Sequence, residues 1–444
     1  MADEMNQEQK TPRQQVEELL GYIEDLMAEE DYSRAQDILN NALRLDHFDI
    51  RIYERYAFVL RMMGMGDAAE LFEKVAFNPN DPQPLFELAR ALMKDKMYGV
   101  AINPLLRVSE MVPMAAAVNF ELGYAYMKEF DIPAARRHFE YAYELEQSPA
   151  TAYYLGYVAL LQNDISITEQ LIGYMDRHFE TTGEEKPPTL QMLKDMMTRY
   201  EAFPEPQTVR DWHFIQYGTP LLRLSKEDLG DDGDLNGRYV FINYGFGSLA
   251  IIMETFTRLI REVPGFPQFE YIIPASYNAA PLAFALSKML EIPLAPVETL
   301  QSERKGLMVA DWTADVDAVA GHIAHNPNVT LFSFALDWTN QAHLTPEVIG
   351  YFDQAHRMPW ESTVVVEIDG TRTQRPEMEE KPEELAEMIL GRLEKIREED
   401  GESIDAVIAY YKERAHLLKV GAQMSMPRMT FQVESPIESV RMMF

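Results

Sequence analysis

The sequence predicts an α + α/β chain, in which an N-terminal all-α superhelix precedes a C-terminal α/β domain with a mostly parallel sheet. Two observations carry this prediction. Alanines recur in the first part at spacings of 33, 33 and 34 residues, at Ala35, Ala68, Ala101 and Ala135. After Pro204, short runs rich in β-branched and aromatic residues alternate with helical patterns. The length of 444 residues fits two or more domains.

Composition limits the functions that the chain can have. The 72 acidic and 40 basic residues give a formal charge of -32, which disfavours binding to nucleic acid and to anionic membranes. Cysteine is absent, so the sequence offers no thiol nucleophile and no thiolate metal site. The polar N-terminus and the lack of a long apolar run predict a cytoplasmic protein. A protein or peptide partner that is apolar or basic is therefore expected.

Each of the recurring alanines lies in a helical pattern. Apolar residues follow four and seven positions later, as Leu39 and Ala42 follow Ala35, and Thr168 continues the series after Ala135. An earlier helix precedes each alanine, most clearly in ELGYAYMKEFDIPAARRHFEYAYELE, where small residues such as Gly123 allow two helices to approach closely. These patterns predict that the N-terminal part of the chain folds into stacked pairs of helices.

These residues resemble five tetratricopeptide repeats spanning about residues 14–180, because the period and the small residues match that family. The resemblance implies a right-handed superhelix whose concave groove is formed by the first helix of each repeat, and in which a partner segment binds. In repeat two, the apolar residues of the first helix, such as Tyr56, and those of the second helix, such as Phe72, fit the repeat period in different registers. This difference predicts that the turn between the two helices is one residue short.

Counting the repeat positions that face the groove gives a candidate partner-binding set. Its members are aromatic or basic side chains, which are common at protein interfaces: Phe58, Phe86, Arg90, Phe120, Tyr124, Tyr153 and Tyr157. In an alternative interpretation these aromatics pack between repeats or against the second half of the chain. A minor alternative is a secretion chaperone, since residues 45–64 resemble the first repeat junction of type III translocator chaperones.

Residues 188–203 predict one amphipathic helix that caps the superhelix and leads into the α/β domain at 205–444. The predicted strands of this domain are YVFINY, FEYIIP, LMVAD, VTLFSFAL and TVVVEIDG. Helical patterns separate the first four of them, and two charged helices follow near 382–399 and 402–418. This alternation is typical of a parallel sheet covered by helices.

The segments FEYIIPASYNAAPLAFALSKMLEIPL and LMVADWTADV resemble the phosphoribosyltransferase fold in order and spacing, within residues 247–338. In that family, two acids at the end of a strand hold the ribose hydroxyls and a metal, and a small-residue loop wraps the 5-phosphate of phosphoribosyl pyrophosphate. The resemblance implies a ligand crevice formed by Ser276, Asn278, Asp311 and Thr313.

Three departures from the family predict that transfer chemistry is lost. Trp312 stands where the second acid is expected, and Asp315 places negative charge where a phosphate would lie. The loop ASYNAAP has no Arg or Lys, and the cations that we expect near the crevice are Arg304 and Lys305. We therefore expect an adaptor or scaffold with no catalytic residues, metal or cofactor. An enzyme or nucleotide sensor that uses magnesium and phosphoribosyl pyrophosphate is the alternative.

Other patterns are weaker. GFGS at 245–248 is typical of a tight turn before a helix. His343, Asp353 and His356 are expected on a loop and a helix and could form a metal site. The methionine-rich residues 421–444 predict either an edge strand of their own domain or a segment that binds another subunit and forms a homo-oligomer.

Overall fold

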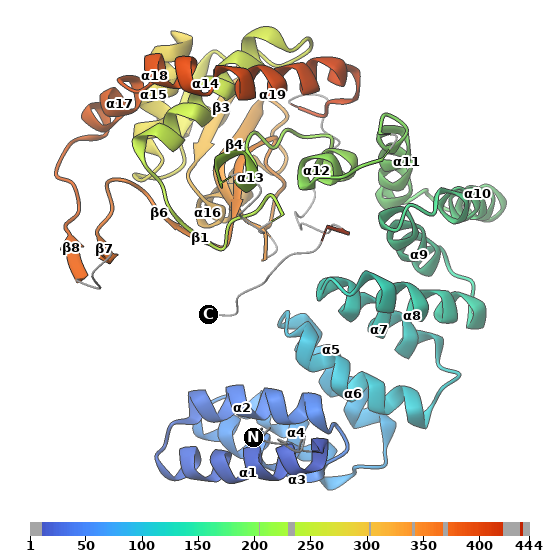
Figure 1. Cartoon of the computed structure of the whole chain (residues 1–444). Coiled ribbons are helices and arrows are strands. Elements are labelled where there is room, and N and C mark those ends of the chain that lie inside the picture. The colour runs from blue at the N-terminus through green and yellow to red at the C-terminus, as the bar shows by residue number, and fades with distance from the viewer. Residues whose placement is uncertain are drawn as a thin grey trace, which may run out of the picture. The chain divides into compact units, whose positions relative to one another are not determined.

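A computed structural model describes residues 11–203, 205–229, 236–301, 303–339, 342–366, 372–420 and 436–437. The chain divides into two compact units, Met1–Lys194 and Asp195–Phe444 (Figure 1). The first is all-helical and the second combines helices with a parallel sheet. Most of the methionine-rich tail, residues 421–444, lies outside the described residues.

The first unit is a helical repeat built from antiparallel helix pairs (Figure 1). Within the described residues, five pairs precede the helix α11. Their bounds are α1 Pro12–Ala28, α2 Tyr32–Leu45, α3 Ile50–Met62, α4 Gly66–Phe77, α5 Pro82–Lys94, α6 Tyr98–Met111, α7 Ala116–Lys128, α8 Ile132–Leu145, α9 Pro149–Leu161 and α10 Ile165–Thr182. Aspartate or serine caps many of the helix starts through a side-chain oxygen, as Asp131 does for α8.

The turns within the five pairs share one backbone conformation. Each has three residues, and its middle residue has a positive φ: Glu30, Gly64, Lys96, Phe130 and Asn163. The prediction of a shorter turn in repeat two is therefore wrong. The irregularity lies inside α4, which has 12 residues where α6 has 14. There Ala69 is fully buried at the interface, whereas Ala68, which the sequence pattern favoured, is only half-buried.

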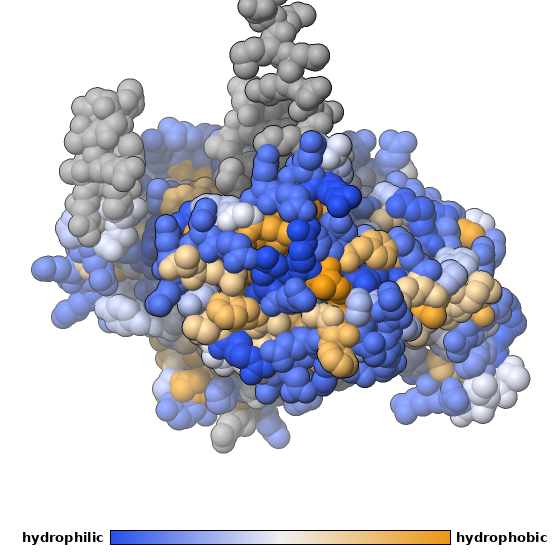
Figure 2. All heavy atoms as spheres, turned by 90° about the horizontal axis from the view of Figure 1, so that it is seen from below, coloured by the Kyte–Doolittle hydropathy of each residue, from blue (hydrophilic) through white to orange (hydrophobic). Residues whose placement is uncertain are grey.

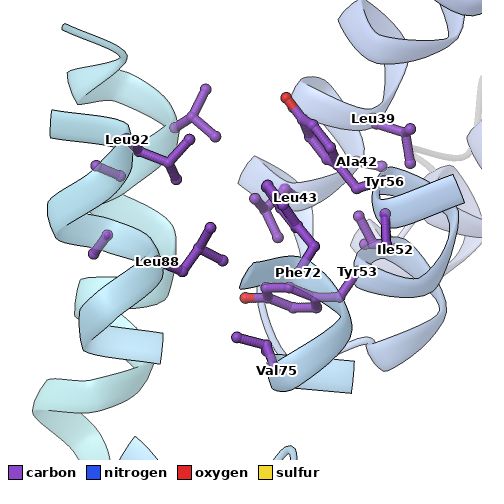
Figure 3. Close-up of a cluster of buried hydrophobic side chains, with 14 of the residues drawn as sticks. Leu39, Ala42, Leu43, Ile52, Tyr53, Tyr56, Phe72, Val75, Leu88 and Leu92 are labelled. Atoms are coloured by element: carbon purple, nitrogen blue, oxygen red, sulfur yellow. The ribbon is translucent and has the colours of Figure 1, made fainter. Parts of the chain in front are cut away.

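Close helix contacts hold each pair together. A Cβ on Gly123 of α7 would lie 2.7 Å from the Phe139 ring of α8, so only glycine fits there without a shift. Thr168 replaces alanine in α10 and donates a hydrogen bond to the carbonyl of Gly156 over 3.0 Å. Within the second pair, Tyr56 of α3 stacks on Phe72 of α4 with ring centroids 4.2 Å apart. Leucines of α5, in the next pair, face this cluster (Figure 3).

Helix α11, Pro188–Tyr200, follows the last pair. Its Leu193 is fully buried and would lie 2.9 Å from a Cβ on Gly156 of α9. Through this contact α11 packs against α9, the first helix of the fifth pair. In the region described, none of the helices has the length and apolarity that crossing a bilayer requires.

The second unit contains a four-stranded parallel sheet in the order β2-β3-β4-β5. The strands are β2 Tyr271–Pro274, β3 Gly306–Ala310, β4 Val329–Asp337 and β5 Val348–Asp353. Shorter pairs add β1 Phe241–Asn243 parallel to β6 Ala355–Arg357, and β7 Thr363–Val366 antiparallel to β8 Arg372–Arg375. The carboxyl ends of β2, β3 and β4 therefore meet at one edge.

Helices cover both faces of this sheet (Figure 1). On one face, α16 Thr313–Ile323 and α12 Val209–Tyr217 pack onto the strands, and Val316 and Val209 join the strand core. On the other, α14 Phe246–Glu262 places Phe256 on Phe332 of β4 with ring centroids 4.5 Å apart. This face also carries α15 Ala280–Leu290, α17 Pro382–Leu390, α18 Leu393–Glu399 and α19 Gly401–Glu413. Shorter helical turns are α13 Ser225–Leu229, η2 Val297–Gln301 and η3 Ala415–Leu417.

Strand β5 was not predicted from the sequence, and the expectation that Asp353 and His356 lie on a loop and a helix is wrong. They belong to β5 and β6. Gly350 interrupts the apolar run of β5, and the sequence pattern therefore did not indicate a strand there. A Cβ at Gly350 would lie 2.2 Å from the carbonyl oxygen of Phe334, so glycine is needed for the approach of β4.

Candidate functional site

A pocket of about 390 Å³ opens at the carboxyl ends of β2, β3 and β6. Its lining residues are Ser276, Tyr277, Asn278, Asp311, Trp312, Ala314, Asp315, His356, Arg357 and Glu361. Three of the four crevice residues predicted from the sequence, Ser276, Asn278 and Asp311, thus come together. Thr313 is not among the lining residues, because its hydroxyl accepts a hydrogen bond from the backbone N–H of Asp337 over 2.7 Å.

Carboxylates dominate the polar lining of this pocket. Asp315, in the first turn of α16, accepts hydrogen bonds from the Ser276 hydroxyl at 2.7 Å and from the Asp311 N–H at 3.2 Å. Glu361 accepts from the Asn278 amide at 3.2 Å. A carboxylate of the chain itself therefore lies in the first turn of α16, the kind of helix start at which a phosphate would bind.

Asp311 is 8% exposed, and it faces like charge. Burial raises the pKa of Asp311 to about 8, and the hydrogen bond and charge of Asp315 and the charge of Glu361 add to this effect. Near neutral pH Asp311 consequently keeps its proton. Asp311, which the resemblance assigns to a ribose hydroxyl, therefore has the acidic side chains of Asp315 and Glu361 as neighbours.

Trp312 forms part of the pocket wall, and a hydrogen bond to Asp353 fixes its side chain. The indole Nε1 donates to Asp353 Oδ1 at 3.0 Å, and His356 Nδ1 lies 2.9 Å from Asp353 Oδ2. The Tyr244 hydroxyl also donates to Asp353 at 2.9 Å. Asp353 is fully buried, so one carboxylate fixes two lining side chains, Trp312 and His356.

The cation of this pocket differs from those that the sequence suggested. Arg304 precedes β3 at the amino ends of the strands, where it pairs with Glu270 at 3.0 Å, and Lys305 is its neighbour. Arg357, at the end of β6, lines the pocket instead. Sequence reasoning missed Arg357 because it missed the strands β5 and β6 that bring it there.

A metal site from His343, Asp353 and His356 does not form. His343 lies 2.9 Å from Asp317, whereas His356 pairs with Asp353. Across the described residues, no group of three or more His, Asp or Glu side chains is arranged to hold a metal ion.

The predicted groove residues lie on the face formed by α3, α5, α7 and α9, together with α1, which we name the A-helix face. Phe58 is 45% exposed, and Arg90 is also exposed. Phe86, Phe120, Tyr124 and Tyr153 are half-buried, and Tyr157 is buried. The aromatic character of this face therefore reaches solvent mainly at Phe58.

The aromatics of α7 and α9 pack against each other. Phe120 and Tyr124 both contact the ring of Tyr154, each with centroids 5.5 Å apart, and Tyr153 lies 6.2 Å from Tyr157. Tyr154 was not among the predicted residues, although its position one residue after Tyr153 places it on the adjoining side of the same helix. The alternative that aromatics pack between repeats describes this part of the face.

Arginines of the A-helix face are matched by glutamates of neighbouring first helices. Arg51 and Arg55 of α3 pair with Glu17 and Glu24 of α1 at 2.7 and 2.6 Å. Arg90 lies 3.8 Å from Glu121, whose pKa is raised by burial. Such exposed pairs contribute little stability, but they leave less net positive charge on the face.

Comparisons with known proteins give no family assignment, since neither a family model nor a curated protein matches. Solved structures do match the chain. MamA (residues 41-end) from Desulfovibrio magneticus RS-1 is 16% identical and covers 38% of this chain and 98% of its own, with a TM-score of 0.25. YrrB, described as a TPR protein with an unusual peptide-binding site, is 16% identical with shares of 42% and 98% and a TM-score of 0.25.

PilF of Pseudomonas aeruginosa is 16% identical and covers 44% of this chain and 86% of its own, with a TM-score of 0.26. Similarity of this degree does not bear on what the chain binds. The helical repeat is established by the helix pairs and turns of the chain itself.

Proposed function

We propose that the chain is a protein-interaction adaptor whose A-helix face binds an apolar segment of a partner. The support is an exposed cluster of large apolar side chains on one repeat. Phe58 is 45% exposed and Met62 is 51% exposed on α3, and Met63 and Met65 are exposed in the turn that follows. Aromatic and methionine side chains are the common anchors of protein interfaces, and methionine adapts to varied partners.

Charge favours a partner segment with basic residues beside its apolar anchor. The arginines of the A-helix face are paired with glutamates, while the whole chain carries -32. A basic segment would be drawn to this field during encounter, and apolar contacts would supply most of the affinity. On the side on which α1 to α4 lie nearest the viewer, apolar side chains gather near the middle and hydrophilic ones surround them (Figure 2).

For the second unit, we propose a phosphoribosyltransferase-like architecture that no longer transfers. The parallel sheet, the covering helices and a pocket that gathers Ser276, Asn278 and Asp311 at the carboxyl ends of the strands support this relation. Three carboxylates against Arg357 in the pocket lining disfavour a polyanionic substrate. The enzyme or sensor reading, with magnesium and phosphoribosyl pyrophosphate, is therefore the weaker alternative.

Selection from a displayed peptide library on the full-length protein tests the adaptor proposal. We expect enrichment of peptides with an apolar or aromatic anchor and basic flanks, and binding of the synthetic peptides to the intact chain. Failure to enrich any peptide family would contradict the proposal, as would enriched peptides that are acidic and lack apolar anchors.

A further inference from the structure

We propose that the pocket at the carboxyl ends of β2, β3 and β6 binds a small zwitterion of the amino-acid class. The ligand's ammonium group would bind between Asp311, Asp315 and Glu361, and its carboxylate would bind Arg357. This inference does not depend on whether the A-helix face binds a partner, because it rests on residues of the second unit alone.

In the part of the chain that the structure describes, the side chains of Asp311, Asp315 and Glu361 form no ion pair with Lys or Arg. Ser276 and Asn278 donate to Asp315 and Glu361, but the buried Asp311 carboxyl has another carboxyl group as its side-chain neighbour. A hydrogen bond from the backbone N–H of Trp312 also reaches the Asp311 side chain. An ammonium group supplies three donors and a positive charge, and it would satisfy several of these oxygens at once.

Arg357 supplies the opposite charge. It is exposed at the pocket, and among the residues that the structure describes its guanidinium has no ion pair. Arg304, by contrast, is paired with Glu270 and lies over the Tyr271 ring. A guanidinium binds a carboxylate through two parallel hydrogen bonds, which makes Arg357 the natural anchor for the anionic end of a zwitterion.

The size and the walls of the pocket set the ligand class. About 390 Å³ lies near the lower end of the range for small-molecule sites, so a single amino acid or a similarly small zwitterion fits better than a nucleotide. Trp312, fixed by Asp353, and Tyr277 offer aromatic surface for the ligand's apolar part.

Binding of the ammonium group should release a proton. Near neutral pH Asp311 keeps its proton because burial raises its pKa to about 8. A cation beside it would favour the ionised form and drive the proton to solvent. The other charged or titratable groups that face the same space are Asp315 of α16, Glu361, Tyr277, and His356 and Arg357 of β6.

Isothermal titration calorimetry of the full-length protein with each free amino acid tests the inference. We expect at least one to bind saturably, with an enthalpy that changes with the ionisation enthalpy of the buffer. Its N-acetyl derivative, which lacks the ammonium, and its decarboxylated amine should each bind at least about 10-fold more weakly.

Asp311→Asn and Arg357→Gln should each weaken binding by about 10-fold or more, whereas Arg304→Gln, outside the pocket, should not. Unchanged circular dichroism and melting temperature would show that the variants fold. Absence of binding by every amino acid at millimolar concentration would overturn the inference. So would equal binding by the N-acetyl derivative, unchanged affinity in Arg357→Gln, or binding of phosphoribosyl pyrophosphate instead.

Discussion

The indole N–H of Trp312 donates a hydrogen bond to the buried carboxylate of Asp353 over 3.0 Å. Trp312 stands at the position where the phosphoribosyltransferase resemblance expects a second acid. Its side chain turns instead to the end of β5 and becomes part of a network with Tyr244 and His356. The residue at which the sequence departs from that resemblance is therefore a fixed wall of the pocket.

Replacing Asp353 should destabilise the second unit. Asp353→Ala removes the acceptor for the half-buried donor of Trp312 and the buried donor of Tyr244, and also the partner of His356. We therefore expect a loss of about 3 kcal/mol or more in the free energy of unfolding. Asp353→Asn keeps one acceptor oxygen and should lose less. Urea unfolding followed by tryptophan fluorescence measures this, because all four tryptophans lie in the second unit. Equal losses in the two variants would argue against the network.

Asp311→Asn should stabilise the second unit in a pH-dependent way. The pKa of Asp311 in the folded chain, about 8, lies above its ordinary 3.8. Below about pH 4 the Asp311 carboxyl is protonated in both the folded and the unfolded chain, so it does not lower the free energy of unfolding. As the pH rises towards 8, the unfolded chain loses its proton first, and the stability of the parent falls.

We therefore expect parent and Asp311→Asn to be similar in stability near pH 4 and to differ by on the order of 2 kcal/mol near pH 8, in favour of the variant. Tryptophan-monitored urea unfolding at several pH values measures the difference. Glu398→Gln, at an exposed position of α18, is the control and should show no such trend. A difference in stability that stays constant across this pH range would contradict the raised pKa of Asp311.

Two glycine substitutions separate close helix packing from intrinsic helix preference in the first unit. Gly123→Ala puts a Cβ 2.7 Å from Phe139, so we expect a loss of about 1 to 3 kcal/mol. Gly21→Ala, on α1, meets no atom within 4 Å and should gain about 0.5 to 1 kcal/mol from helix preference. Helical circular dichroism during urea unfolding measures both. A gain in both variants would rule out tight packing at Gly123.

The sequence predicted the helical repeat well because its signal is local and recurs. Each pair needs small residues such as Gly123 and Ala135 where its helices touch, and the period makes these visible. The register of α4 was harder, since Ala68 and Ala69 both satisfy the pattern and tertiary packing selects Ala69. Periodicity fixed the faces of the helices but not how far each aromatic ring is buried, so the mutual packing around Tyr154 was not foreseen.

In the second unit, the strands flanked by clear turn signals were predicted, and β5 was not. Residues Ser276, Asn278 and Asp311 follow predicted strands, so parallel pairing was enough to bring them to one edge. Arg357 lies at the end of β6, which follows β5, and Gly350 interrupts the apolar pattern of β5. The glycine is required by the neighbouring strand in three dimensions, and that requirement cannot be seen in the local sequence.

The adaptor account is tested most directly by the dissociation constant of a library-selected peptide for three forms of the full-length protein. These are the parent, Phe58→Ala on the A-helix face, and Phe77→Ala, which removes an aromatic ring that is 90% exposed at the end of α4. We predict that Phe58→Ala weakens binding by about 10-fold, or 1.4 kcal/mol, and that Phe77→Ala leaves it unchanged. Equal affinities in the parent and Phe58→Ala would contradict recognition on the A-helix face.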